Sequence, residues 1–254
     1  MTWLAPYARL PAPDPMAVTV AVVPVLLLLL AASGHGRHRT TSPALWASFL
    51  LGALVVVPVG ALGVQLAGLA PPVERIYMNA TFHSFVNAGL LEESAKLAML
   101  VVIAACFAPR PKDWIVLATA TGLGFAAAEN VIYAAAIDRF DVLAIRSITA
   151  IPAHAAIGTL MGTMALLAAG RGVAGASLVL LVPAVSHGLY DLPLHVVNGI
   201  VTNEHELTTE IILFNGGLFA VVFAALVVFA ATGLDVARRN AVAPPIRPRP
   251  VGQQ

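Results

Sequence analysis

The sequence predicts an all-α fold, a polytopic transmembrane helix bundle of about seven spans, and three observations support this prediction. Only 11% of the 254 residues are charged and 59% are hydrophobic, whereas a soluble domain carries about 25% charged residues. The mean hydropathy is +0.88. The apolar residues form long runs, each near the roughly 20 residues that a spanning helix needs. A soluble enzyme, a nucleic-acid binder and a disordered chain are therefore excluded.

The first span is expected to stay in the mature protein. Its leucine run, Leu26–Leu30, followed by small residues resembles a cleavable signal peptide. The basic residues Arg37 and Arg39 come directly after it, however, and such a cluster resists export. The seven expected spans are Met16–Ser33, Ala44–Ala70, Ser84–Ala108, Trp114–Ile137, Ser147–Ala169, Val173–Val197 and Ile211–Gly233.

Residues 1–241 are expected to form a single membrane domain, because no linker or soluble segment interrupts the spans. Residues 242–254, which are rich in proline and arginine, are predicted to be a disordered cytoplasmic tail. The single cysteine, Cys106, excludes an internal disulfide and a multi-cysteine metal site.

The placement of lysine and arginine predicts the orientation in a plasma membrane. An alternating threading puts nine of these residues on one side and four on the other, with Lys96 inside a span. The richer side is expected to be cytoplasmic, so the N-terminus lies outside and the C-terminus inside. The four residues assigned to the outer side are Arg9, Arg75, Arg139 and Arg146.

Ionisable residues inside the spans are the feature that points to function, because each costs roughly 2.5–3.5 kcal/mol near the bilayer centre. At a rise of about 1.5 Å per residue, the expected depths of the carboxylates and histidines fall within roughly 9–15 Å of the outer end of each span. A shared depth on helices of alternating direction predicts one hydrated polar cavity. The residues are Glu92, Glu93 and Lys96 in the third span, Glu129 with Asn130 in the fourth, His154 in the fifth, and His187 and Asp191 in the sixth.

Helical spacing indicates which of these side chains meet. Glu92 and Lys96 are four residues apart and are expected to form an ion pair. His187 and Asp191 have the same spacing, so the carboxylate can fix the imidazole tautomer. His154 shares a stripe with Gly158 and Gly162, a small-residue surface that lets another helix approach closely.

Four motifs in these spans resemble those of a known family. Residues 92–96 match EExxK, residues 125–130 match FxxxEN, an isolated histidine follows at His154, and residues 187–191 match HxxxD. In this order, within residues 82–194, the set resembles the PrsW family of bacterial intramembrane proteases. That family is related to the type II CAAX prenyl proteases and the CPBP superfamily.

The resemblance implies hydrolysis of a peptide bond in or near the membrane span of a membrane-anchored protein, with an anti-sigma factor as the family's best-known substrate. It assigns catalysis to Glu92, Glu93, Glu129, Asn130, His154, His187 and Asp191. Glu93 is the preferred base because Lys96 is expected to neutralise Glu92. Asn130 and His187 would stabilise the oxyanion, and Phe125, which shares a face with Glu129, is assigned to substrate binding.

No cofactor is favoured, although zinc or another divalent metal is the alternative, with His154, His187 and Glu129 as ligands. The partners expected are the substrate protein and the lipid bilayer, and no nucleic acid. Two other functions stay open at this stage, because intramembrane Asp, Glu and His also mark proton relays. These are a proton- or ion-coupled transporter and a non-catalytic membrane scaffold of the same fold.

Overall fold

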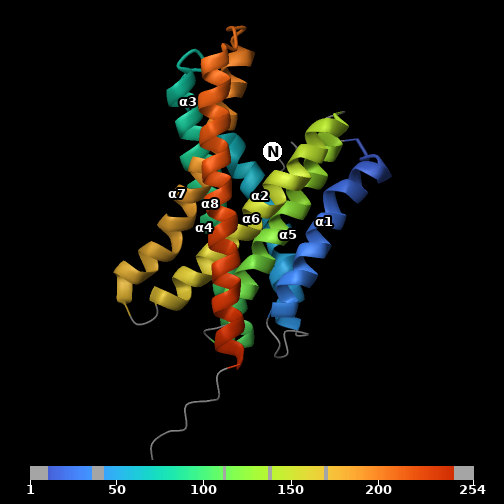
Figure 1. The fold of residues 1–254 in the computed structure, drawn as a ribbon, viewed down its shortest axis with the longest axis vertical. Coiled ribbons are helices and arrows are strands. Elements are labelled where there is room, and N and C mark those ends of the chain that lie inside the picture. The colour runs from blue at the N-terminus through green and yellow to red at the C-terminus, as the bar shows by residue number, and fades with distance from the viewer. Residues whose placement is uncertain (1–10, 36–42, 111–112, 137–138, 169–170, 243–254) are drawn as a thin grey trace, which may run out of the picture.

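The computed structural model describes residues 11–35, 43–110, 113–136, 139–168 and 171–242, and all regular secondary structure in these ranges is helical (Figure 1). This confirms the predicted fold class. The elements are α1 (Pro15–His35), α2 (Pro43–Ala67), α3 (Ile76–Phe82), the π-helix η1 (His83–Glu92), α4 (Glu93–Phe107), α5 (Asp113–Ala136), α6 (Phe140–Ala168), α7 (Gly172–Thr202) and α8 (Thr209–Val242).

Six of these helices are long and apolar enough to cross a membrane: α1, α2, α5, α6, α7 and α8. In a bilayer the helix is the form that satisfies every backbone polar group within one segment. The chain is therefore a multi-pass membrane protein.

The third expected span, residues 84–108, is built differently from the other six. It is occupied by η1 and α4, preceded by the short helix α3. Phe82, Glu92 and Glu93 all keep right-handed helical backbone angles at the junctions, so residues 76–107 follow one helical path. The π segment divides that path, and neither neighbouring α-helix reaches the length of a span. The path ends at Ala108, which adopts the left-handed conformation (φ 42°) directly before Pro109.

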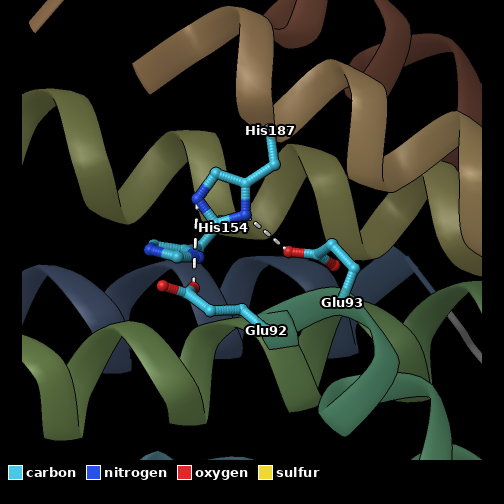
Figure 2. Close-up of side chains that lie close together, drawn as sticks. All are labelled: Glu92, Glu93, His154 and His187. Atoms are coloured by element: carbon cyan, nitrogen blue, oxygen red, sulfur yellow. Dashed lines mark hydrogen bonds and ion pairs between the residues drawn. The ribbon is translucent and has the colours of Figure 1, made fainter. Parts of the chain in front are cut away.

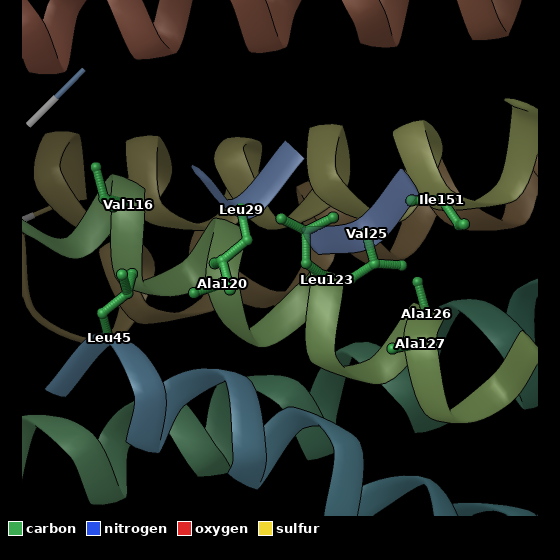
Figure 3. Packing of buried hydrophobic residues seen from close by; sticks show 9 residues of the cluster. All are labelled: Val25, Leu29, Leu45, Val116, Ala120, Leu123, Ala126, Ala127 and Ile151. Carbon is green, nitrogen blue, oxygen red and sulfur yellow. The ribbon is translucent and has the colours of Figure 1, made fainter. Parts of the chain in front are cut away.

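Helices α5 and α6 form the centre of the bundle. In their most apolar 18-residue windows, 78% and 67% of the residues are buried, against 11% for α8. One core cluster joins these helices to α1 and α2 (Figure 3). Its buried members are Val25, Leu29, Leu45, Val116, Ala120, Leu123, Ala126, Ala127 and Ile151.

The small-residue stripe of α6 packs against α5, as the spacing predicts. A Cβ at Gly158 would meet the carbonyl oxygen of Ala118, and one at Gly162 would meet the backbone of Ile115. Gly122 on α5 lies equally close to the carbonyl of His154. Glycine at these positions lets the two backbones approach closely, and this contact fixes the position of His154 in the bundle.

The start of α6 also differs from the prediction, and this difference bears on the site. The helix begins at Phe140, seven residues before the expected Ser147, and extends to Ala168. Arg146, expected in an outer loop, therefore lies inside the helix, and its side chain is only 18% exposed. The expected tail, residues 242–254, lies outside the described residues apart from Val242.

Candidate active site

Two glutamates and two histidines come together in the middle of the bundle. Glu92 ends η1, Glu93 begins α4, and His154 and His187 come from α6 and α7 (Figure 2). One ligand atom from each side chain lies within 4.8 Å of the others. Glu93, His154 and His187 are buried, and Glu92 is 16% exposed. The structure thus brings together four of the predicted catalytic residues.

Lys96 places its ammonium group among these four side chains. The Nζ atom lies 2.7 Å from Glu93 Oε1, 3.4 Å from Glu92 Oε2 and 3.1 Å from His154 Nδ1. The predicted ion pair with Glu92 is present, but the shorter contact is with Glu93. The reason for preferring Glu93 as the base, that Lys96 neutralises Glu92 instead, is therefore wrong.

The imidazole of His187 is held between carboxylates. Its Nδ1 atom lies 2.8 Å from Glu93 Oε1, and its Nε2 atom lies 3.4 Å from Asp191 Oδ2 and 3.9 Å from Glu92 Oε2. The i, i+4 contact with Asp191 is the one that the HxxxD spacing predicts. Because carboxylates face both ring nitrogens, the orientation of the ring is fixed.

His154 is held from its other side by Glu129. Its Nε2 atom lies 3.0 Å from Glu129 Oε2, while its Nδ1 atom accepts a hydrogen bond from the Lys96 ammonium, which can only donate. The Nε2 atom therefore carries the proton of the neutral ring. Glu129, expected as a metal ligand, lies outside the group of four and orients His154 instead.

Arg146 contacts two residues of the site, although the sequence predicts that it lies in an outer loop. Its Nη2 atom lies 3.0 Å from Glu129 Oε1, and its Nε atom donates to Asn130 Oδ1 at 3.0 Å. The guanidinium carbon lies 3.7 Å from the centre of the Tyr133 ring. One sequence signal could have found it, since Arg146 and His154 are eight residues apart and share a helix face.

Phe125 on α5 is 1% exposed and packs against the site. Lys96 Nζ lies 4.1 Å from the centre of its ring, and the His154 ring centre lies 5.5 Å away. Phe125 is not among the residues that line the neighbouring cavity, so a direct contact with substrate stays a prediction without geometric support.

A cavity of about 330 Å³ opens beside the histidines. Arg146, Thr149 and Tyr190 form part of its polar wall, and Ile145 and Phe219 part of its apolar wall. The cavity reaches His154, His187, Glu129 and Asp191. Of the group of four, the two histidines line this cavity, and Glu92 and Glu93 do not.

The group of four fits a divalent cation by type and by spacing. Two imidazoles and two carboxylates are ordinary zinc ligands, and Glu93 Oε2 is buried with no hydrogen-bond partner among the described residues. The Lys96 ammonium, however, contacts three of the four candidate ligands. A metal ion bound there would have to displace it.

Comparison with known proteins decides the family. The family model described as PrsW family intramembrane metalloprotease matches residues 40–232. The chain belongs to the PrsW family. The match includes all four motifs of the site and confirms the predicted resemblance.

Two curated members of the PrsW family show how far the similarity extends. Protease PrsW of Bacillus subtilis (strain 168) is 31% identical over 150 residues, which cover 57% of this chain and 66% of that protein. Protease PrsW of Shouchella clausii (strain KSM-K16) is 34% identical over 116 residues, 45% of this chain and 51% of that protein. The chain thus spans less than two thirds of each curated relative. No solved structure is significantly similar to it.

Proposed function

We propose that this PrsW-family chain is an intramembrane endopeptidase that hydrolyses a peptide bond in or near the span of a membrane-anchored protein. The observation that carries the proposal is the buried cluster of Glu92, Glu93, His154 and His187 beside a cavity within a membrane bundle. The relatives named Protease PrsW support the same reaction. An anti-sigma factor with a single span is the substrate class that the family resemblance suggests.

Peptide hydrolysis requires a base for the attacking water, donors for the oxyanion and a proton for the leaving amine. We assign the base to Glu92 in place of Glu93. Glu93 is fully buried and is engaged at 2.7 and 2.8 Å by Lys96 and His187. Glu92 makes only longer contacts and is 16% exposed, so its carboxylate is the freer of the two to accept a proton.

In the proposed reaction, Glu92 takes a proton from water as the oxygen attacks the scissile carbonyl carbon. A histidine N–H at His187, which lines the cavity, is the proposed donor to the oxyanion. The amide of Asn130, predicted as a second donor, is fully buried and does not line the cavity, so the geometry does not support it in that role. The carbon–nitrogen bond then breaks as the proton held by Glu92 passes to the leaving amine, which gives a carboxylic acid and an amine. A proton then passes from the acid to the amine, so that the products are a carboxylate and an ammonium group. Glu129 keeps His154 in one orientation throughout.

Metal-dependent hydrolysis is the second candidate, because the family description names metalloproteases. His154, His187 and the carboxylates of Glu92 and Glu93 would hold the ion, which would polarise the carbonyl and activate water. We favour the metal-free mechanism because the Lys96 ammonium already neutralises this group. Metal analysis of the purified protein with a chelator test decides between them: stoichiometric zinc that is lost together with activity would overturn our preference.

Reconstitution in liposomes with a single-span substrate tests the proposed function. We expect cleavage by the wild-type protein, a loss of about 10²–10⁴-fold in rate for Glu92→Gln, and full activity for Glu206→Gln in the exposed loop after α7. Ion flux without cleavage would identify a transporter, and tight binding alone a scaffold.

Glu93→Gln separates the two glutamates. Because it breaks the buried contacts with Lys96 and His187, we expect it to lower the thermal stability as well as the activity. If Glu93→Gln abolished cleavage without lowering the thermal stability, and Glu92→Gln stayed active, Glu93 and not Glu92 would be the base.

A further inference from the structure

Arg146 makes two directional contacts to consecutive residues of the FxxxEN motif. Its Nη2 atom pairs with Glu129 Oε1 and its Nε atom donates to Asn130 Oδ1, both at 3.0 Å. Stacking on Tyr133 holds the guanidinium plane in place. A planar guanidinium with fixed donors can hold two acceptors at once, and a lysine ammonium does so less well.

The contact with Asn130 fixes which end of that amide is free. Arginine can only donate hydrogen bonds, so the atom that faces it is the carbonyl oxygen Oδ1. The Nδ2 group is buried and has no partner among the residues that the structure describes. Arg146 therefore leaves Asn130 with an unused donor.

The contact with Glu129 extends to His154, one of the four clustered side chains. One carboxylate oxygen accepts from Arg146, and the other lies 3.0 Å from His154 Nε2. With the proton held on Nε2, His154 turns Nδ1 toward Lys96, 3.1 Å away. A continuous chain of contacts thus runs from Arg146 through Glu129 to His154.

We propose that Arg146 is a positioning residue of the active site, which holds Glu129 and Asn130 and acts through Glu129 to fix His154 between Glu129 and Lys96. The expected effect of Arg146 on the cleavage rate rests on the proposed function. The effect on the His154 tautomer is independent of any activity.

The first test is ¹⁵N NMR of histidine-labelled protein in detergent micelles, with the His154 signals assigned by loss in His154→Gln. We expect Nε2 protonated and Nδ1 unprotonated in the wild-type protein, and a mixed tautomer in Arg146→Gln. Arg146→Lys, which keeps a charge beside Glu129, should retain the wild-type pattern. An unaltered tautomer in Arg146→Gln would overturn the proposal even if the protein cleaves no substrate.

The second test is a double-mutant cycle in the cleavage assay. We expect Arg146→Gln to lower kcat by at least 10-fold with KM unchanged within about twofold, and Arg146→Lys to restore part of kcat. Because part of the effect of Arg146 passes through Glu129, the double variant with Glu129→Gln should lose less than the sum of the two single losses. Additive losses, or an effect on KM only, would show instead that Arg146 binds substrate directly.

Arg139→Gln is the matched control for both tests. Arg139 lies next to the start of the same helix and pairs with Asp141 on the exposed surface. Its loss should leave the tautomer and kcat at wild-type values. A loss of kcat in this variant equal to that of Arg146→Gln would show a general effect on α6 and would contradict a positioning role.

Discussion

The ammonium group of Lys96 lies among the side chains that would bind a catalytic metal ion. It contacts Glu92, Glu93 and His154, three of the four candidate ligands. Two cations cannot share such a small buried space without strong repulsion. The lysine and a divalent metal are therefore competitors for one set of side chains.

Removing the lysine charge should raise the affinity for zinc. We expect purified Lys96→Met to bind zinc at least 10-fold more tightly than the wild-type protein, about 1.4 kcal/mol, as measured by competition with a chromophoric chelator. Arg75→Met, which removes an exposed charge outside the bundle core, is the control and should not alter the affinity. Equal affinities for wild-type protein and Lys96→Met would show that the ammonium does not compete with the metal.

Much of the site could be predicted from single residues, since a buried charge in an apolar span is costly and needs a partner. Glu92, Glu93, His154 and His187 could be predicted in this way, as could the i, i+4 contact of His187 with Asp191. Arg146 could not be assigned to a span in this way, because the position of a span edge is predicted from local polarity. Arg139, Asp141 and Arg146 all lower the local hydropathy there. The fold shows that α6 begins early enough to place Arg146 next to Glu129.

At the scale of elements, the contact between α5 and α6 determines where His154 lies. Gly158 is one turn from His154 on α6, and a Cβ there would collide with the carbonyl of Ala118 on α5. Backbone atoms cannot move aside as a flexible side chain can. A larger residue would therefore push the two helices apart.

Gly158→Ala should destabilise the bundle by about 1–3 kcal/mol and lower the cleavage rate, because His154 moves with α6. The free energy of unfolding in an SDS titration measures the first effect. Gly217→Ala on α8, where nothing lies within 4 Å of the added Cβ, is the matched control and should be neutral or stabilising by about 0.4–1 kcal/mol. Equal losses in the two variants would show that close packing at Gly158 is unimportant.

The π-helix η1 shows what helical periodicity cannot predict. Regular α-helical spacing places Glu92 and Glu93 about 100° apart, facing different neighbours. In the structure Glu92 ends a ten-residue π segment, and both glutamates approach His187. Segments of π-helix are often found at functional sites, but their wider hydrogen-bond spacing leaves no mark in the pattern of apolar residues.

At the scale of the whole molecule, the orientation in the membrane decides from which side a substrate is cut. The two ends of α7, at Arg171 and Asn203, lie on opposite sides of the bundle (Figure 1). The distribution of lysine and arginine predicts that the Asn203 end is outside. Because α6 begins earlier than predicted, Arg146 lies inside the helix and no longer counts as an outer residue. Nine lysine and arginine residues then lie on the predicted inner side and three on the outer side, and this larger difference strengthens the prediction.

Single-cysteine labelling tests the orientation, and the chain suits it because Cys106 is the only cysteine. In a Cys106→Ser background, we expect Glu204→Cys, exposed in the turn after α7, to react with a membrane-impermeant maleimide in intact cells. Arg171→Cys, exposed at the other end of α7, should react only after permeabilisation. The reverse pattern would invert the topology, and with it the side of the membrane from which the site is predicted to be reached.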